Sequence, residues 1–328
     1  MTLNLVSSLF KENKGKLSPL LINSEDLSGP ALMNPTVLVR EGSIFVNLRN
    51  VNYTLYHSET SNYEHAFGPL VYVHPEADLH LRTTNYLLEV NPDLSVKHYA
   101  KVDTSKLDVK PLWEFVGLED ARLVDWDNKL FLCGVRRDTT TNGVGRMELS
   151  EIEFDWENNT CVEVSRHRTR IPNENEYCNK NWMPILNNPY HFIKWCNPLE
   201  IIHTGPNVLE PVSTTYGEFT SGHLDWRGGS QVVEIDNCYV CIVHETNLFK
   251  SKAGRKNAIY RHRFLVFDKN WNRIKVSKEF SFLGMNIEFC CGLAKYGDNL
   301  LITFGAQDNA AYILRADKQR IMEFINEQ

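Results

Sequence analysis

The feature that most constrains the fold of this chain is a hairpin pattern that occurs five times. Each copy begins with polar or small residues and has two short apolar runs separated by a turn. The copies are NPTVLVREGSIFVNLRN from Asn34, EDARLVDWDNKLFLCGVRR from Glu119, NWMPILNNPYHFIKWCNP from Asn181, RGGSQVVEIDNCYVCIVHE from Arg227 and EFCCGLAKYGDNLLITFGAQD from Glu288. Apolar runs of this length, bounded by turn residues, are typical of β-strands.

The copies start roughly 45 to 85 residues apart, and further strand pairs such as ELSEIEFDWENNTCVEV lie between them. Five four-stranded units predict an all-β, five-bladed β-propeller. A β-sandwich is the alternative, but it does not explain five copies of one hairpin. We expect a single domain over residues 1–328, with residues 1–33 as an N-terminal lead-in. Residues 315–328 form a short C-terminal helix in this prediction, because apolar residues recur there at helical spacing.

Composition argues against several classes of partner. A formal net charge of -6 offers no basic surface for nucleic acid. The apolar runs are too short to span a bilayer, and the first residues lack the segments of a signal peptide. The eight cysteines are scattered, as reduced thiols are in cytosolic proteins. We therefore expect a cytoplasmic protein, and whether it forms a homo-oligomer stays open.

A metal site is not expected. The CYVC stretch from Cys238 to Cys241 has the CxxC spacing of zinc sites, but strand alternation would turn the two side chains to opposite faces. No second pair of cysteines or histidines stands at a matching spacing. The sequence also has no glycine-rich nucleotide motif, so we expect neither a metal nor another cofactor.

The polar residues at the start of each hairpin are the candidate site. In a propeller, the innermost strand of each blade lines the central channel, so residues at its entry converge on one mouth. Glu119, Asp120 and Arg122 stand at this entry in the second copy. The alternative is that such residues only cap or turn the chain. Because most of the five copies carry ionisable or amide groups there, we favour a ring of site residues.

Several of these stretches resemble a known enzyme group. NPTVLVREGSIFVNLRN, GLEDARL, KNWMP and IEFCCGL followed by LLITFGAQD are similar to signature stretches of glycoside hydrolase family 130, the β-mannoside phosphorylases and their hydrolase relatives. The related glycosyltransferase family 108 shares that fold. The resemblance runs from about Asn34 to about Leu314 and implies a five-bladed propeller that transfers glycosyl groups with inversion.

The resemblance also implies roles for single residues. The general acid of the family falls on Asp120, in GLEDAR, where the proline of the family's motif is replaced by Ala121. RGGSQ, at residues 227–231, departs from the usual mannoside phosphorylase wording and looks more like members associated with sugar transfer. The expected substrate-binding residues are Glu119, Arg122, Asn181, Trp182, Arg227, Ser230, Gln231, Glu288 and Asp308. The expected phosphate-binding residues are Arg49, Arg136, Arg137, Lys180 and His244.

The chemistry of inverting cleavage supports a phosphorylase. A hydrolase needs a second carboxylate to activate water, whereas phosphate is already a nucleophile and needs cations to hold it. One strong acid candidate and several cations therefore favour transfer to or from a sugar phosphate over hydrolysis, and the resemblance implies phosphorolysis or synthesis of a β-mannoside-like linkage. The expected partners are a carbohydrate and inorganic phosphate or a sugar 1-phosphate. The alternatives are an inverting hydrolase, with Glu288 or Glu245 activating water, and a non-catalytic sugar-binding propeller.

Overall fold

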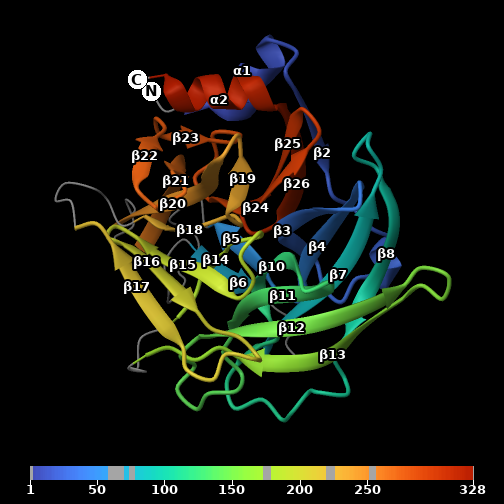
Figure 1. The fold of residues 1–328 in the computed structure, drawn as a ribbon. Coiled ribbons are helices and arrows are strands. Elements are labelled where there is room, and N and C mark those ends of the chain that lie inside the picture. The colour runs from blue at the N-terminus through green and yellow to red at the C-terminus, as the bar shows by residue number, and fades with distance from the viewer. Residues whose placement is uncertain are drawn as a thin grey trace.

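The computed structural model describes residues 3–57, 70–73, 78–172, 179–218, 226–250 and 256–327. Its strands can be grouped into five largely antiparallel units that follow one another along the chain (Figure 1). Unit 1 consists of β3 (Ala31–Arg40), β4 (Ser43–Val51), β7 (Leu81–Val90) and β8 (Val96–Asp103). Unit 2 consists of β10 (Glu119–Trp126), β11 (Lys129–Arg136), β12 (Arg146–Asp155) and β13 (Thr160–Arg168). Units 1 and 2 are joined into one nine-stranded sheet by a short parallel pairing between β8 and β13. Unit 3 consists of β14 (Met183–Pro184), β15 (His191–Cys196), β16 (Leu199–His203) and β17 (Val212–Tyr216).

The last two units complete the β-structure. Unit 4 consists of β18 (Arg227–Gly228), β19 (Val233–Ile235), β20 (Cys238–Lys250), β21 (Lys256–Phe267) and β22 (Arg273–Val276). Unit 5 consists of β24 (Glu288–Tyr296), β25 (Asn299–Ala306), β26 (Ala310–Asp317) and β2 (Gly15–Pro19). The shorter pieces are β1 (Leu3–Asn4), β5 (Thr54–His57), β6 (Leu70–Val73), β9 (Phe115–Val116), β23 (Phe280–Ser281), α1 (Leu5–Lys11), the 3-10 turn η1 (Ser24–Asp26) and α2 (Lys318–Asn326).

The tight turns of the repeated hairpins follow from their sequences. Asp127 and Asn128 join β10 to β11 with φ angles of 55° and 62°, and Asp236 and Asn237 join β19 to β20 with 48° and 63°. Two consecutive residues with positive φ are the mark of the type I′ turn, whose twist matches that of a hairpin. Asn and Asp tolerate this backbone conformation better than most residues, which explains their place in the repeat.

The hydrophobic core is divided into clusters between neighbouring units. In β11, Leu130 and Leu132 pack in a cluster shared with unit 1, whereas Phe131 and Cys133 pack in one shared with unit 3. This alternation buries both faces of the sheet and explains the unbroken apolar run. Units 3 and 4, units 4 and 5, and units 5 and 1 also share clusters. Because the fifth unit packs on the first, the five units close into a ring (Figure 1). β3, β10, β14, β18 and β24 lie around its centre, where the view also shows β5 and β6.

The ring closes through a strand from near the start of the chain. β2 is the fourth strand of unit 5 and pairs antiparallel with β26 from Gly15↔Ala316 to Pro19↔Tyr312. Residues 1–33, predicted only as a lead-in, therefore contain a strand of the last unit and also the helix α1, which the sequence pattern did not reveal. Figure 1 shows α1 and α2 side by side over units 4 and 5, where both contribute to the shared core.

The predicted mostly β fold with a C-terminal helix is confirmed, and α2 begins at Lys318 rather than at residue 315 because β26 continues to Asp317. The Asp317 side chain accepts a hydrogen bond from the backbone N–H of Arg320 and so caps the helix. No helix in the described part of the chain is both long enough and apolar enough to cross a bilayer.

Candidate active site

A cavity of about 300 Å³ gathers side chains from all five units. Its walls are formed by Met33, Asn34, Arg49, Tyr53, Phe115, Glu119, Asp120, Arg137, Lys180, Asn181, Arg227, His244, Tyr260, Ile287, Phe289 and Asp308. Most of these residues stand at the ends of the inner strands or directly beside them. The convergence expected from the repeated hairpins is therefore present.

The backbone at the inner-strand entries turns polar side chains into this cavity. Asn34, Asp120 and Asn181, from units 1, 2 and 3, have φ angles of 45°, 48° and 60°. In units 1 and 2 the regular pairing is interrupted at these residues, as in a β-bulge. Bulges re-aim a side chain and are common beside active sites. Left-handed backbone at residues other than glycine also costs energy and clusters at functional sites, which supports a functional role for this ring.

Asp120 is the best-placed candidate for proton transfer. Its Oδ1 accepts a hydrogen bond from Asn34 Nδ2 at 2.8 Å and another from Arg49 Nη1 at 2.7 Å. Among the described residues, no group bonds to Oδ2, which leaves that oxygen for a ligand. Burial raises the pKa of Asp120, but the guanidinium groups of Arg49 and Arg122 outweigh it, so that the pKa lies below its ordinary value. Asp120 is therefore ionised in the empty cavity at neutral pH.

Arg49 organises the surroundings of Asp120. Its guanidinium also donates to Tyr53 Oη at 2.9 Å and to Thr83 Oγ1 at 3.0 Å, and it lies 3.4 Å from Glu119 Oε2. Glu119 forms a second ion pair with Arg137 at 3.2 Å. Burial raises the pKa of Glu119, although both arginines counteract this effect. The two carboxylates thus share the buried Arg49, and Glu119 also pairs with the partly exposed Arg137, an arrangement that holds Asp120 rigidly.

The opposite wall is cationic and aromatic. Lys180, Arg227 and His244 line it together with Tyr260, whose ring stacks on His244 at a centroid distance of 5.6 Å. Burial, together with nearby cationic groups, holds the pKa of His244 well below its usual range, so the ring is neutral. His244 Nδ1 lies 3.1 Å from the carbonyl of Gly228 and must carry the proton there. Its Nε2 is then an acceptor, suited to a sugar hydroxyl or a protonated phosphate oxygen.

Two amide oxygens and a second carboxylate complete the cavity. Asn34 Oδ1 and Asn181 Oδ1 are buried and accept no hydrogen bond from the described residues. Buried polar atoms without partners are rare and suggest a ligand that supplies them. Burial raises the pKa of Asp308 to about 6, and the charge of Asp120 adds to this effect. Asp308 therefore holds a proton more readily than Asp120 does.

Nine of the fifteen predicted site residues line this cavity. They are Arg49, Glu119, Asp120, Arg137, Lys180, Asn181, Arg227, His244 and Asp308. The other six lie outside its walls, and the structure gives each a different task. The predicted direct contact with substrate or phosphate needs correction for these six.

Arg122 and Trp182 lie behind the wall of the cavity. Arg122 donates to the carbonyl of Gly229 at 2.8 and 2.9 Å and to the carbonyl of Asp120 at 2.6 Å, so it positions the Asp120 backbone. Trp182 is buried and packs against Phe192 at 5.9 Å, although it also borders a smaller hollow of about 100 Å³ beside Lys180.

Ser230 and Gln231 are fully buried parts of the scaffold. Gln231 Nε2 donates to the carbonyls of Val37 at 2.8 Å and Leu123 at 2.9 Å, and its Oε1 accepts from the Leu293 N–H at 3.1 Å. One amide therefore ties the inner strands of units 1, 2 and 5 to unit 4. Ser230 Oγ accepts a hydrogen bond from the N–H of Ile242 at 2.9 Å within unit 4.

Glu288 is also a scaffold residue. Its carboxylate accepts hydrogen bonds from the backbone N–H groups of Phe282, Leu283 and Met285 at 2.5 to 2.9 Å, and the residue is fully buried. Glu245, the other candidate for activating water, accepts from Trp226 and pairs with Arg263 at 2.6 Å. Neither carboxylate belongs to the wall of the cavity.

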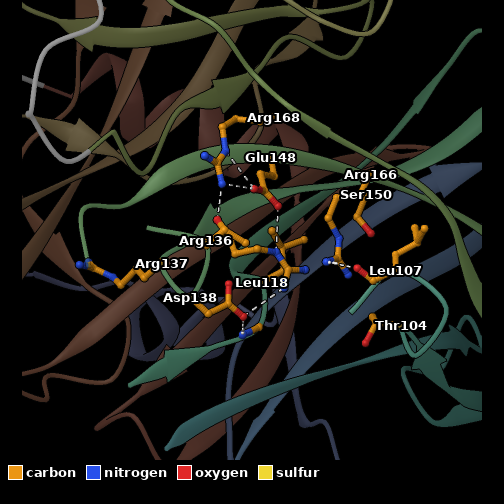
Figure 2. A network of polar contacts seen from close by, with 12 residues as sticks. Thr104, Leu107, Leu118, Arg136, Arg137, Asp138, Glu148, Ser150, Arg166 and Arg168 are labelled. Carbon is orange, nitrogen blue, oxygen red and sulfur yellow. Dashed lines mark hydrogen bonds and ion pairs between the residues drawn. The ribbon is translucent and has the colours of Figure 1, made fainter. Parts of the chain in front are cut away.

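Arg136 points away from the cavity because side chains alternate along β11. Figure 2 shows its guanidinium between two carboxylates, those of Glu148 at 2.8 Å and Asp138 at 3.4 Å. Asp138 in turn accepts a hydrogen bond from the N–H of Gly117 at 3.0 Å, directly before the stretch that carries Asp120. Arg136 therefore supports the site from behind, whereas its neighbour Arg137 faces the cavity.

Asn34 and Tyr260 are two polar cavity residues that were not among the predicted site residues. Asn34 opens the first hairpin as Asp120 opens the second, so the repeat itself contained the signal. Tyr260 lies on β21, behind β20 in unit 4, and no motif marks it. Within the described ranges, no cluster of three or more His, Cys, Asp or Glu side chains is arranged to hold a metal ion.

Comparison with known proteins shows what the fold is similar to. No protein-family model matches the sequence, and no curated protein sequence matches it significantly. Among solved structures, the chain is similar to a β-1,2-mannobiose phosphorylase from Listeria innocua in complex with β-1,2-mannobiose. The TM-score is 0.56 and the identity 13%, over 94% of this chain and 96% of that one.

Two further structures extend the likeness. One is a putative glycoside hydrolase from Parabacteroides distasonis, with a TM-score of 0.59 and 13% identity over 88% of each chain. The other is a mannose phosphorylase from Leishmania mexicana in complex with a phosphate ion, with a TM-score of 0.50 and 10% identity over 97% of this chain and 93% of that one. The chain therefore shares its fold with mannoside phosphorylases and glycoside hydrolases over nearly its whole length.

Proposed function

We propose that this chain is a carbohydrate-active enzyme that transfers a glycosyl group with inversion, by phosphorolysis or synthesis of a β-mannoside-like linkage. In this proposal the closed ring of five units is a five-bladed β-propeller and the cavity is its active site. The observation that carries the proposal is the cavity itself. It places a carboxylate with a free oxygen, unpaired amide oxygens and several cations within one space of about 300 Å³.

The residues suggest distinct roles around a sugar phosphate. Asn34 and Asn181, which line the cavity, would hydrogen-bond sugar hydroxyls through their side-chain amides. Lys180 and Arg227 would hold phosphate, since charged and planar donors suit its oxygens, and the Nε2 of His244 would accept a hydrogen bond from a protonated phosphate oxygen. The likeness to a phosphorylase solved with phosphate and another solved with mannobiose supports this division at the level of the fold.

The ionised state of Asp120 fits the synthetic direction. The acceptor hydroxyl would give its proton to Asp120 Oδ2 while its oxygen forms the new bond to C1 of the donor. The bond between C1 and the phosphate oxygen would break, and the phosphate would leave with the bonding electrons towards the cations. In phosphorolysis the same steps run backwards, and Asp120 must first take up a proton. Its lowered pKa makes that state less populated in the empty cavity at neutral pH.

A hydrolase is the second candidate function, and the position of Asp308 in the cavity is the observation that favours it. Glu288 and Glu245 are held by the scaffold, so neither is placed to activate water. Asp308 lies in the cavity with its pKa raised to about 6, and none of the described residues hydrogen-bonds its carboxylate. An inverting hydrolase could use it as the base opposite Asp120.

A screen of sugar 1-phosphates against a panel of sugar acceptors, followed by phosphate release, tests the proposal. Mannose 1-phosphate with a mannoside acceptor should release phosphate and form a disaccharide, and Asp120→Asn should abolish both. A hydrolase would instead release free sugar from a mannoside without phosphate. Glycan binding that survives Asp120→Asn, with no turnover of any substrate, would identify a non-catalytic sugar-binding protein.

The cytoplasm remains our proposed location. The seven described cysteines are free thiols, and burial raises the pKa of six of them, which makes them unreactive. Fractionation of cells that express a tagged chain would test the location directly.

A further inference from the structure

A second cavity, of about 200 Å³, lies between units 1 and 2. Its walls come from β7, β8, β11 and β12 and from the segments around residues 104–108 and 116–118. The polar residues that matter here are Thr83, Lys101, Thr104, Asp108, Arg136 and Ser150. None of them lines the candidate active site.

Arg136 brings a cation with an unused donor to this second cavity. The side chain is 4% exposed, and its Nε and Nη1 face Glu148 and Asp138 (Figure 2). Its Nη2 donates to no atom of the described residues. Arg168 also pairs with Glu148 at 3.2 Å, so the two arginines balance the two carboxylates behind the wall. Nη2 can therefore serve a ligand without leaving either carboxylate unpaired.

The other polar groups of the wall differ in whether they already form hydrogen bonds within the protein. Asp108 is the single carboxylate among the described residues of the wall, and its two oxygens accept hydrogen bonds from Arg166 at 3.0 Å and Thr104 at 2.8 Å. Ser150 donates its hydroxyl hydrogen to Glu163. Lys101 is exposed, and its ammonium group forms no hydrogen bond or ion pair with the described residues. The charged groups of the wall that remain unused are thus two cationic donors, on Arg136 and Lys101.

We propose that this second cavity binds an oxyanion of the size of phosphate, held by Arg136 Nη2 and Lys101 Nζ. A ligand here must accept hydrogen bonds, and charge-assisted bonds from an arginine and a lysine suit phosphate oxygens. The anion is either free phosphate or the phosphate group of a sugar phosphate. The aliphatic side of the wall, formed by Val102, Val116, Leu118 and Leu132, would lie against the sugar in the second case.

Thr83 and Arg49 lie between the second cavity and the candidate active site. Thr83 lines the second cavity, and its hydroxyl accepts hydrogen bonds from Arg49 Nε and Nη2 at 3.2 and 3.0 Å. Arg49 in turn holds Asp120. An anion in the second cavity would therefore lie one side chain away from the cation that sets the charge state of Asp120.

Calorimetric titration of the full chain with inorganic phosphate tests the proposal, with mannose 1-phosphate as a second titrant. The wild type should bind two phosphate ions. Lys101→Gln should raise the dissociation constant of one site by about tenfold, since bonds to charged groups contribute about 1.5–3 kcal/mol. Lys106→Gln is the matched control, because Lys106 is exposed on the segment after β8 and does not line the cavity. It should leave both sites unchanged.

Lys180→Gln separates the second cavity from the candidate active site, since it should weaken only the other site. If the active-site proposal fails, one phosphate still binds, and Lys101→Gln weakens it. Phosphate binding that Lys101→Gln leaves unchanged overturns the second site, as does a wild type whose whole phosphate binding is lost in Lys180→Gln. Binding of inorganic phosphate but not of mannose 1-phosphate at the Lys101-dependent site identifies the free ion as its ligand, and binding of both identifies a site that accepts sugar phosphates.

Discussion

Arg136 and Arg137 are neighbours in sequence, yet they serve two regions with opposite character. The interior of unit 2 holds Arg136 between two carboxylates that it neutralises. The candidate active site holds Arg137 beside Glu119, where other polar atoms remain without partners. Both regions are rich in arginines and acids. What distinguishes the candidate active site is that side chains from all five units converge on it and that Asp120 keeps a free carboxylate oxygen there, and not the presence of charge.

Replacement of each arginine in turn by a neutral side chain should give the largest difference in stability between the two regions. Arg136→Met leaves the buried carboxylates of Asp138 and Glu148 without the cation that they share, which should cost about 3–5 kcal/mol of unfolding free energy. Arg137→Met is the matched variant, and its partly exposed ion pair should cost less than about 1 kcal/mol. Urea unfolding of both variants measures the difference. Equal losses would show that the two regions do not differ as described.

Asp120→Asn should lower activity while leaving the stability of the fold largely intact. Loss of a general acid or base typically lowers turnover by about 100-fold or more, while Arg49 keeps Glu119 as a partner and the fold persists. Asp125→Asn is the control, because Asp125 lies at the far end of β10 and pairs with Arg40. Steady-state kinetics on an unactivated substrate is the measurement. Near wild-type turnover in Asp120→Asn would remove this residue from the mechanism.

Asp308 should make stability depend on pH in a defined window. Its pKa is raised from 3.8 to about 6, so the folded chain binds a proton that the unfolded chain releases. The stability that the protonated group contributes is complete below about pH 4 and is lost as the pH rises through 6. Asp308→Asn should therefore gain up to about 3 kcal/mol over the wild type at pH 7 and close to nothing at pH 4. Unfolding curves at the two pH values check this, and the same gain at both would exclude titration of Asp308 as the cause.

Arg227→Lys should give the smallest effect. Lysine keeps the charge of Arg227 but cannot make a planar two-point contact with a phosphate or carboxylate group. We expect the apparent affinity for the sugar phosphate to fall by about fivefold, with the melting temperature almost unchanged. A lower melting temperature with intact kinetics would instead make Arg227 a structural clamp.

The parts of the fold that could be predicted from sequence are those that repeat. Five apolar hairpins with turn residues between them predicted the inner strands of the five units, because local pattern and local structure coincide there. The contribution of β2 to unit 5 could not be predicted, since GKLSP has no strong strand pattern and its partner lies near residue 315. Pairing between two strands that are far apart in the sequence leaves no pattern in either segment.

Site residues could be predicted only where the position of a residue in the repeat also determines whether its side chain points into the cavity. Asp120 and Asn181 occupy bulged or left-handed entries, so they face the cavity as expected. Arg136 stands beside Arg137, and Glu288 stands between Ile287 and Phe289. These neighbours line the cavity, but alternation or a buried turn takes Arg136 and Glu288 out of it. Sequence spacing alone does not resolve a difference of one residue, although that difference decides between a ligand and a scaffold role.

The pairing of β2 with β26 also has a consequence for how the chain acquires its structure during synthesis. The main strands of units 1 to 4 emerge consecutively from the ribosome, but β2 emerges before all of them and must wait for β26, which ends at Asp317. Until then the outer edge of unit 5 is absent and β2 has an unpaired backbone, which invites association with other nascent chains. The last step is closure of a loop of nearly three hundred residues, and such distant pairing is slow. The pairing of β2 with β26 should therefore be the slow step in the folding of this protein.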